Sequence, residues 1–404
     1  MSLDIKIVNA NMRTSGGKLM EIGISAGKIS KIAEKIGENA AQQIDAKGNL
    51  VSESYVNGHL HLDKVYTLEM VGQDALGSYH GSDMGGAMTA IEQASRVKDN
   101  YDESWIIENV RRAARLAVKY GNTHIRAFAD VDTKGKLEGV KALLKAREEF
   151  KDQVTLQVVA FPQDGVVRDP GAVEYIEEAL KMGADVVGGI PWIEFTDADA
   201  QTHIDTMTDL AVKYKKPVSM LVDDTGDPGF RTIEYLAVQA IKKGLIGKVT
   251  AQHARAMALY PEPSYRKIEA LLLKAGMGLV SDPQTGPLHA RVRDLYAAGV
   301  PVALGQDDIA DAYYPFGRNN MLEVGFLAVH LLWMTTFEDM EKIYDMITTN
   351  AAKALGIRDF ALKEGNPANL VVLTQPNVWK ALWEHEAPAY VIKNGKDITL
   401  RDQG

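Results

Sequence analysis

V-N-G-H-L-H-L-D-K, at residues 56–64, is the most informative stretch of this sequence. Its histidines, His59 and His61, alternate with Leu60, and successive side chains of a β-strand point to opposite faces, so the two imidazoles share a face. Gly58 permits close approach of another backbone or a ligand. Two imidazoles at a strand end supply half of a metal site. Two surface histidines beside a loop are the alternative reading, but the apolar neighbours on both sides favour a buried strand.

Short apolar runs alternate with amphipathic stretches along most of the chain. Eight runs have the pattern of buried strands: 56–62, 123–130, 155–163, 185–192, 217–224, 249–253, 278–282 and 302–307. Residues 103–119, 138–150, 172–182, 200–214, 231–243, 264–275 and 288–298 have the apolar spacing of helices. This alternation predicts an α/β fold, a (β/α)8 TIM barrel, with an open doubly wound sheet as the alternative. The count of eight and the histidine pair at the end of the first strand favour the barrel.

Both ends of the chain have β patterns. Residues 19–25 and 29–32 alternate on either side of a turn, as in a hairpin, and residues 44–51 have the pattern of a further strand with its own turn. After a helical stretch over 321–355, residues 365–373 and 390–396 again favour strands. The N-terminal strands are too few to bury a core alone, so we expect both ends to combine into one small β-sandwich. The expected domains are a barrel over 54–357 and the two sandwich parts, 1–53 and 358–404.

Composition limits the functions open to the chain. Its 404 residues are 46% hydrophobic and 25% charged, as in an ordinary globular protein. The net charge of −9 disfavours nucleic acid and membrane surfaces as partners. Without cysteine, any metal must be held by His, Asp, Glu or Lys. The N-terminus lacks the apolar core of a signal peptide and no run approaches the roughly 18 residues of a membrane span, so a cytoplasmic location is expected. Association into a homo-oligomer stays open.

Polar residues gather where the expected strands end. The first strand ends with His59 and His61, the sixth with His253, and the eighth with Asp307 and Asp308. In a barrel these ends meet at one face, where three histidines and an aspartate could hold a metal and leave room for water. A polar, glycine-rich stretch over 72–86 predicts a long loop of the kind that often forms a lid.

The chain resembles the amidohydrolase superfamily nearly from end to end, and within it the cytosine-deaminase-like enzymes. The resemblance includes H-L-H-L-D-K at 59–64, L-Q-V-V-A-F-P-Q at 156–163, V-T-A-Q-H at 249–253, the Asp307–Asp308 pair with Y-P-F-G at 314–317, and N-P-A-N-L at 366–370. The chain is also similar to the triazine aminohydrolases of the same branch.

This resemblance implies one catalytic Zn²⁺ or Fe²⁺, held by His59, His61, His253 and Asp307, and hydrolysis of a C–N bond at an sp² ring carbon. It implies that Asp307 takes the proton of the attacking water and that an acid near the fifth strand serves the leaving nitrogen. Gln163 matches a position that hydrogen-bonds the amide edge of the substrate. Asp308 and Phe161 match other pocket positions.

The fifth strand departs from the family pattern. A metal-binding histidine and, three residues later, a catalytic glutamate are expected where this chain has Leu221 and Asp224. The second strand also departs, with Phe128 where relatives often have histidine. In one reading the metal stays, Asp224 is the acid, and Asp223 serves as a replacement ligand. In the other, the site has lost its metal and its chemistry.

The expected function is hydrolytic deamination, or a related C–N cleavage, of a small nitrogen heterocycle or cyclic amidine. Water and the heterocycle are the expected partners. The alternative is a non-catalytic descendant with an incomplete metal site that binds a small molecule.

Overall fold

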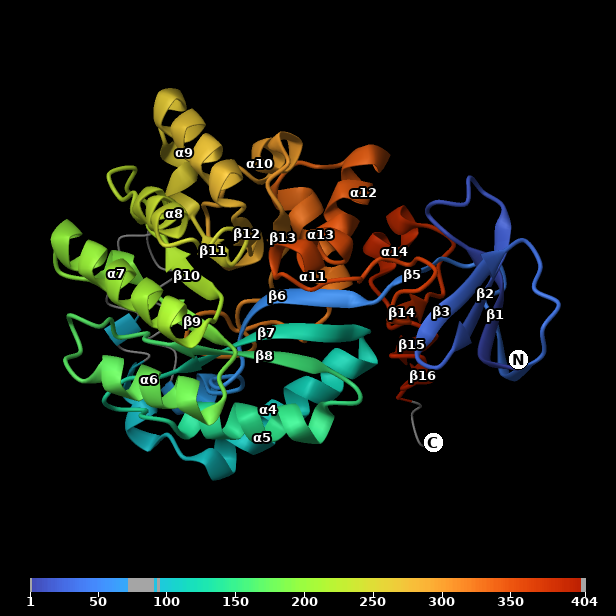
Figure 1. Cartoon of the computed structure of the whole chain (residues 1–404), viewed down its shortest axis with the longest axis horizontal. Helices are drawn as coiled ribbons and strands as arrows, with labels where there is room; N and C mark the ends of the chain where they lie inside the picture. Colours follow the sequence, from blue (N-terminus) through green and yellow to red (C-terminus); the bar gives the residue numbers. More distant parts are fainter. Residues whose placement is uncertain (1, 72–90, 93–94, 401–404) are drawn as a thin grey trace.

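The computed structural model describes residues 2–71, 91–92 and 95–400. It has a large part in which strands are surrounded by helices and a smaller β part built from both chain ends (Figure 1). The expected lid over residues 72–86 lies outside the described residues. Among the helices of the described chain, none has the length and apolar character needed to cross a membrane.

Eight parallel strands form the centre of the large part, and each pairs with the next one along the chain. They are β6 (Tyr55–His61), β7 (Asn122–Asp130), β8 (Thr155–Phe161), β9 (Val186–Gly189), β10 (Val218–Val222), β11 (Val249–His253), β12 (Gly278–Ser281) and β13 (Val302–Leu304). A bridge between Leu60 and Asp307 joins the last strand end to the first strand and closes the sheet. The predicted barrel is therefore confirmed, and the open sheet is wrong.

Helices follow the strands and cover the sheet from outside (Figure 1). They are α4 (Glu103–Lys119), α5 (Glu138–Phe150), α6 (Ala172–Met182), α7 (Asp197–Tyr214), α8 (Thr232–Lys242), α9 (Glu262–Ala275) and α10 (Val292–Ala298). The single helical stretch expected over 321–355 is instead α11 (Met321–Leu331), α12 (Phe337–Asp345) and α13 (Thr349–Ala354). The first break occurs because Trp333 has a left-handed φ of +54° and the Thr336 hydroxyl then caps α12.

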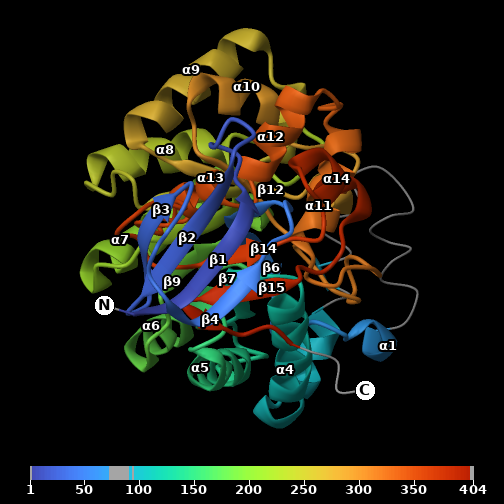
Figure 2. The same cartoon turned by 90° about the vertical axis from the view of Figure 1, so that its right-hand side faces the viewer.

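Two four-stranded sheets form the smaller part, which lies at one end of the barrel (Figures 1 and 2). One contains β1 (Leu3–Asn11), β2 (Leu19–Ser25), β3 (Lys28–Ala33) and β4 (Ala40–Asp45); the other contains β5 (Val51–Glu53), β14 (Leu370–Val372), β15 (Tyr390–Lys393) and β16 (Lys396–Asp397). Ile7 and Ile24 of the first sheet share a buried cluster with Leu370 and Ile392 of the second.

The turn predicted within residues 44–51 is present, but it separates two strands of different sheets. Residues 44–51 are not one strand, because the chain turns between β4 and β5 with left-handed φ values at Lys47 and Gly48. The turn lets β4 join the N-terminal sheet while β5 pairs with β14 from the other end of the chain. A short helix, α14 (Val378–Glu384), follows β14 and was not expected from the sequence.

Candidate active site

The backbone places Asp307 directly against the histidine strand. The Asp307 N–H donates to the His59 carbonyl at 2.9 Å, and the His61 N–H donates to the Asp307 carbonyl at 2.8 Å. The two adjacent backbone segments need glycine to approach this closely. A Cβ at Gly305 would lie 2.7 Å from the His59 Cβ, and a Cβ at Gly58 would lie 2.9 Å from the Leu304 carbonyl oxygen. The close approach expected at Gly58 is thus confirmed.

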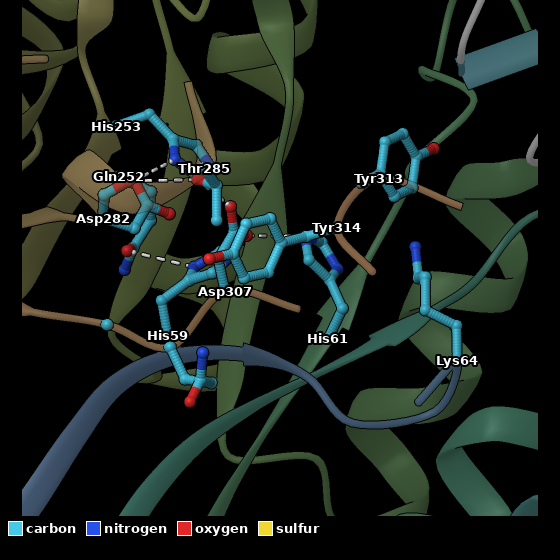
Figure 3. A network of polar contacts seen from close by, with 12 residues as sticks. His59, His61, Lys64, Gln252, His253, Asp282, Thr285, Asp307, Tyr313 and Tyr314 are labelled. Carbon is cyan, nitrogen blue, oxygen red and sulfur yellow. Dashed lines mark hydrogen bonds and ion pairs between the residues drawn. The ribbon is translucent and has the colours of Figure 1, made fainter. Parts of the chain in front are cut away.

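The side chains at these strand ends form a compact buried cluster (Figure 3). His59 Nε2 lies 3.1 Å and His61 Nε2 3.8 Å from Asp307 Oδ1, and the rings of His59 and His253 are 4.9 Å apart between centroids. His253 and Asp307 both have left-handed backbones, with φ of +63° and +67°. Non-glycine residues adopt this region at a cost of roughly 1–3 kcal/mol, and such residues concentrate at functional sites.

Asp282 belongs to the same cluster. Ligand atoms of His59, His253, Asp282 and Asp307 lie within 4.8 Å of one another, and His61 forms an overlapping group with Asp307 and Asp308. The sequence analysis passed over Asp282, although it follows β12 directly. The rule that singled out His253 and Asp307, a polar residue at the carboxyl end of a barrel strand, applies to Asp282 as well.

The hydrogen bonds of the cluster leave nitrogens that suit a cation. His59 Nδ1 contacts Gln252 Oε1 at 3.1 Å, and the Gln252 amide donates to Ser219 Oγ at 2.7 Å, so His59 Nδ1 carries a proton. The other ring nitrogen, Nε2, is buried, faces a carboxylate oxygen of Asp307 at 3.1 Å, and is the atom that a metal would take. His253 Nδ1 bonds Asp282 Oδ1 at 2.8 Å, which turns its other nitrogen to the cluster. Imidazoles held from behind in this way, together with a carboxylate, fit a divalent metal.

The electrostatic environment of the cluster is strongly polarised. Burial, with help from the nearby positive charge of Lys64, lowers the pKa of His61 well below its ordinary value. Burial opposes the ionisation of Asp307, but the neighbouring His253 and His59 outweigh it and hold the pKa of Asp307 well below its usual range. Burial likewise opposes protonation of His253, yet the surrounding carboxylates raise its pKa to about 9. Neutral His61 and ionised Asp307 are the forms that bind a metal, whereas His253 must release a proton to bind one.

A pocket opens in front of the cluster and collects most of the residues predicted from the sequence. Asp224 and Gln163 line it together with His61, His253, Asp307 and Asp308. Sequence reasoning missed its apolar and cationic lining residues, which are Ile91, Ile190, Trp192, Arg255 and Tyr313. Phe161 lies behind His61, with ring centroids 5.5 Å apart, and packs against Phe128.

The β10 side of the pocket carries an ion pair. Leu221 faces the pocket, and Arg255 Nη1 binds Asp224 Oδ1 at 2.5 Å. The other terminal nitrogen of Arg255 donates to Thr285 Oγ1 at 2.6 Å and lies 3.6 Å from Asp282 and 3.7 Å from Asp307. The guanidinium therefore balances several buried carboxylates.

Asp223 does not serve as a replacement ligand, so that prediction is wrong. Its carboxylate accepts hydrogen bonds from the Thr232 and Ile233 N–H groups at 2.6 and 3.2 Å and from the Tyr260 hydroxyl at 2.6 Å. The strand ends at Val222 and Asp223 has a φ of +49°, so strand alternation no longer sets its direction. Asp223 is turned to the N-terminus of α8 instead.

A closed parallel barrel with a buried His/Asp cluster at the carboxyl ends of its strands defines a class of hydrolytic metal sites. The amidohydrolase family model matches residues 42–397, and the chain belongs to this family. It is a hydrolase that acts on C–N bonds, and the cytosine-deaminase-like resemblance inferred from the sequence is confirmed.

Three relatives show how far the similarity extends. N-isopropylammelide isopropyl amidohydrolase of Pseudomonas sp. (strain ADP) is 32% identical over all of this chain and 99% of its own. The crystal structure of 5-methylcytosine deaminase from Klebsiella pneumoniae, liganded with 5-fluorocytosine, is 31% identical, with a TM-score of 0.89 over 99% of this chain and 98% of that one. Pterin deaminase of Rhizobium rhizogenes (strain K84 / ATCC BAA-868) is 26% identical over 88% of this chain and 82% of its own.

Proposed function

We propose that this protein hydrolyses an exocyclic C–N bond at an sp² carbon of a small nitrogen heterocycle or cyclic amidine, by deamination. The relatives named above act on an ammelide, a methylated cytosine and a pterin, all of which are flat nitrogen heterocycles with exocyclic substituents. The pocket suits such a ring, because its lining combines apolar Ile190, Trp192 and Leu221 with polar groups that can bind a ring edge.

The proposed cofactor is one Zn²⁺ or Fe²⁺ held by His59, His61, His253 and Asp307. Such an ion lowers the pKa of a bound water toward neutrality and polarises the reacting carbon. Asp282 supports it through His253 Nδ1, and Gln252 supports it through His59 Nδ1. The proposed domains are the barrel over 54–357 and a β-sandwich formed by 1–53 and 358–404.

Asp307 is the proposed proton acceptor for the attacking water. Its Oδ2 accepts a hydrogen bond from Thr285 Oγ1 at 2.8 Å, which fixes the carboxylate plane. Its depressed pKa keeps the carboxylate ionised, so that its oxygens can accept a hydrogen bond from the water and orient it.

Asp224 is the proposed carrier of a proton to the leaving nitrogen. Because Arg255 binds the carboxylate of Asp224, this side chain must receive a proton before it can give one to the leaving nitrogen. The proton released by water can supply it, so that one proton is taken up and returned in each turnover.

Two further side chains are proposed to bind the heterocycle. Gln163 is proposed to form a hydrogen bond with the amide edge of the heterocycle. Asp308 donates to the ring as a neutral carboxyl, because burial, together with Asp307 and Asp311, raises the pKa of Asp308 well above its ordinary value. Phe161 supports the pocket by packing against His61.

The buried cluster of His59, His253, Asp282 and Asp307 is the observation that carries this proposal. The test is ammonia release by Zn²⁺- or Fe²⁺-loaded protein across a panel of aminopyrimidines, aminotriazines and aminopteridines. Turnover of at least one ring, lost in His59→Ala/His61→Ala, supports the proposal. Tight binding of a ring without turnover at full metal occupancy would overturn it in favour of a non-catalytic binding protein.

A further inference from the structure

A network of buried charges lies beside the pocket and includes none of the proposed metal ligands. Lys64, three residues beyond His61, places its ammonium 2.9 and 3.0 Å from the two carboxylate oxygens of Asp130 and 3.0 Å from Gln163 Oε1. It also lies 5.5 Å from the centroid of the Tyr313 ring, toward which it points in Figure 3. The side chain of Lys64 is 8% exposed, and none of the proposed catalytic steps uses it.

The contact with Lys64 determines how the Gln163 amide is oriented. An ammonium group has three donors and no acceptor, so only the oxygen of the amide can face it. The Gln163 amino group must then point elsewhere, and Gln163 lines the pocket. The backbone at this position is also held, because the Gln163 N–H donates to the Phe161 carbonyl at 3.0 Å in the turn after β8.

We propose that Lys64 is a positioning residue that makes Gln163 a one-way hydrogen-bond donor to the substrate and thereby selects rings with an acceptor at that edge. The inference rests on the proposed function and adds the direction of the hydrogen bond between Gln163 and the ring. A free glutamine amide can rotate and bind either a donor or an acceptor. Gln163, with its oxygen engaged by a buried cation, can offer only N–H. The ring edge that it meets must therefore present a carbonyl oxygen or an unprotonated ring nitrogen.

The chain offers a matched control in a second buried lysine. Lys98 binds Asp132 at 2.6 Å and Asp164 at 2.7 Å, and lies 3.6 Å from Asp130. These contacts of Lys98 are all to carboxylates, whereas Lys64 contacts the Gln163 oxygen. Lys64→Met and Lys98→Met thus remove the same charge from the same network, but only the first releases the amide. Lys98 also stays near Asp130 in Lys64→Met, so this carboxylate keeps a cation.

The experiment measures direct binding of matched ring pairs to the metal-loaded protein by calorimetry. Each pair, such as 1-methylpyridin-2-one and 2-methylaniline, presents either a carbonyl or an amino group at the same place on a flat ring of the same shape, with no unprotonated ring nitrogen. We expect the wild type and Lys98→Met to prefer the carbonyl member by about tenfold or more, since a mismatched ring leaves a buried donor unpaired. We expect the preference in Lys64→Met to fall to about threefold or less, because the amide can now turn.

A second variant keeps the test decisive where Lys64→Met fails to fold. Gln163→Glu retains an oxygen for Lys64 but presents an acceptor to the pocket, so the preference should reverse toward the amino member. Carbonyl preference that persists in Gln163→Glu, or in folded Lys64→Met, would overturn the inference, as would a wild type that binds both members equally. Failure of every ring to bind the wild type would instead contradict the proposed function itself, and this inference with it.

Discussion

The two sides of the pocket show different relations to the family pattern. On the β6, β11 and β13 side, His59, His61, His253 and Asp307 stand where the resemblance places metal ligands, and the backbone bridge of Asp307 to β6 locks them together. On the β10 side the backbone positions of the expected histidine and glutamate are present, but the side chains there differ from the family pattern. Leu221 faces the pocket with no ligand atom, and Asp224 is held by Arg255.

This difference indicates where the charge of the site has moved. An imidazole ligand at Leu221 and a longer carboxylate at Asp224 would both interact with the metal side. Instead, the guanidinium of Arg255, two residues after β11, lies among Asp224, Asp282 and Asp307. We infer that the β10 side is an electrostatic support for the carboxylates, while the β6 side holds the proposed metal ligands.

The largest expected effect comes from removing the imidazoles of the β6 side. His59→Ala/His61→Ala should lower bound metal by more than tenfold, because two of the four proposed ligands are lost. Metal content by elemental analysis and unfolding temperature are the measurements. His124→Ala is the control, since His124 is buried in β7 but contacts Thr123 and Lys393. A double variant that keeps full metal occupancy would disprove the β6 site.

The next largest effect is expected at Asp307. Asp307→Asn keeps the shape but cannot accept a proton as a base, so kcat at matched metal loading should fall by about 10² or more. Asp359→Asn is a suitable control, because Asp359 is also left-handed, with φ of +52°, but exposed. Unchanged kcat in a fully metal-loaded Asp307→Asn protein would exclude Asp307 as the base.

A smaller effect is expected at Asp224. Asp224→Glu restores the length found in relatives and adds about 1.5 Å of reach. Because Asp224 already contacts Arg255 at 2.5 Å, the extra methylene must displace the guanidinium or enter the pocket. We expect KM for the true substrate to rise about fivefold, because an extra methylene in a closely packed site displaces its neighbours. Steady-state kinetics test this, with exposed Asp227→Glu in the same loop as control. An equal or lower KM would mean that the short side chain is only a handicap.

The sequence predicted the metal side of the pocket better than its other side for a physical reason. His59 and His61 share a strand face through simple alternation, and strand ends of a parallel barrel meet at one edge, so their meeting with His253 and Asp307 follows from local patterns. The eight strands of the barrel were found in the same way. Arg255 gave no such signal, because its direction depends on a chain that leaves β11 through left-handed His253 and Ala254.

Backbone turns also explain the errors. Asp223 is a candidate metal ligand only if strand alternation continues past Val222, where the strand has already ended. Within 44–51, the expected turn, through Lys47 and Gly48, separates two strands of different sheets. Periodicity predicts side-chain direction within an element. Beyond its end, tertiary contacts decide the direction, such as the hydrogen bonds that the N–H and the hydroxyl of Thr232 donate to Asp223.

The smallest expected effect comes from returning an imidazole to the β10 side. Leu221 lines the pocket beside His253 and Asp307, so Leu221→His would place a nitrogen donor near the proposed metal. We expect metal affinity to rise by about threefold. Supporting groups behind a histidine ligand are typically worth 10–100-fold, and an introduced imidazole has none prepared to hold its second nitrogen. Competition with a chelator measures the affinity. Val222→His is the matched control. Val222 packs in the core beneath the helices, so the introduced imidazole would lie on the strand face opposite to that of Leu221. Equal affinities for Leu221→His and wild type would mean that the β10 side no longer takes part in holding the metal.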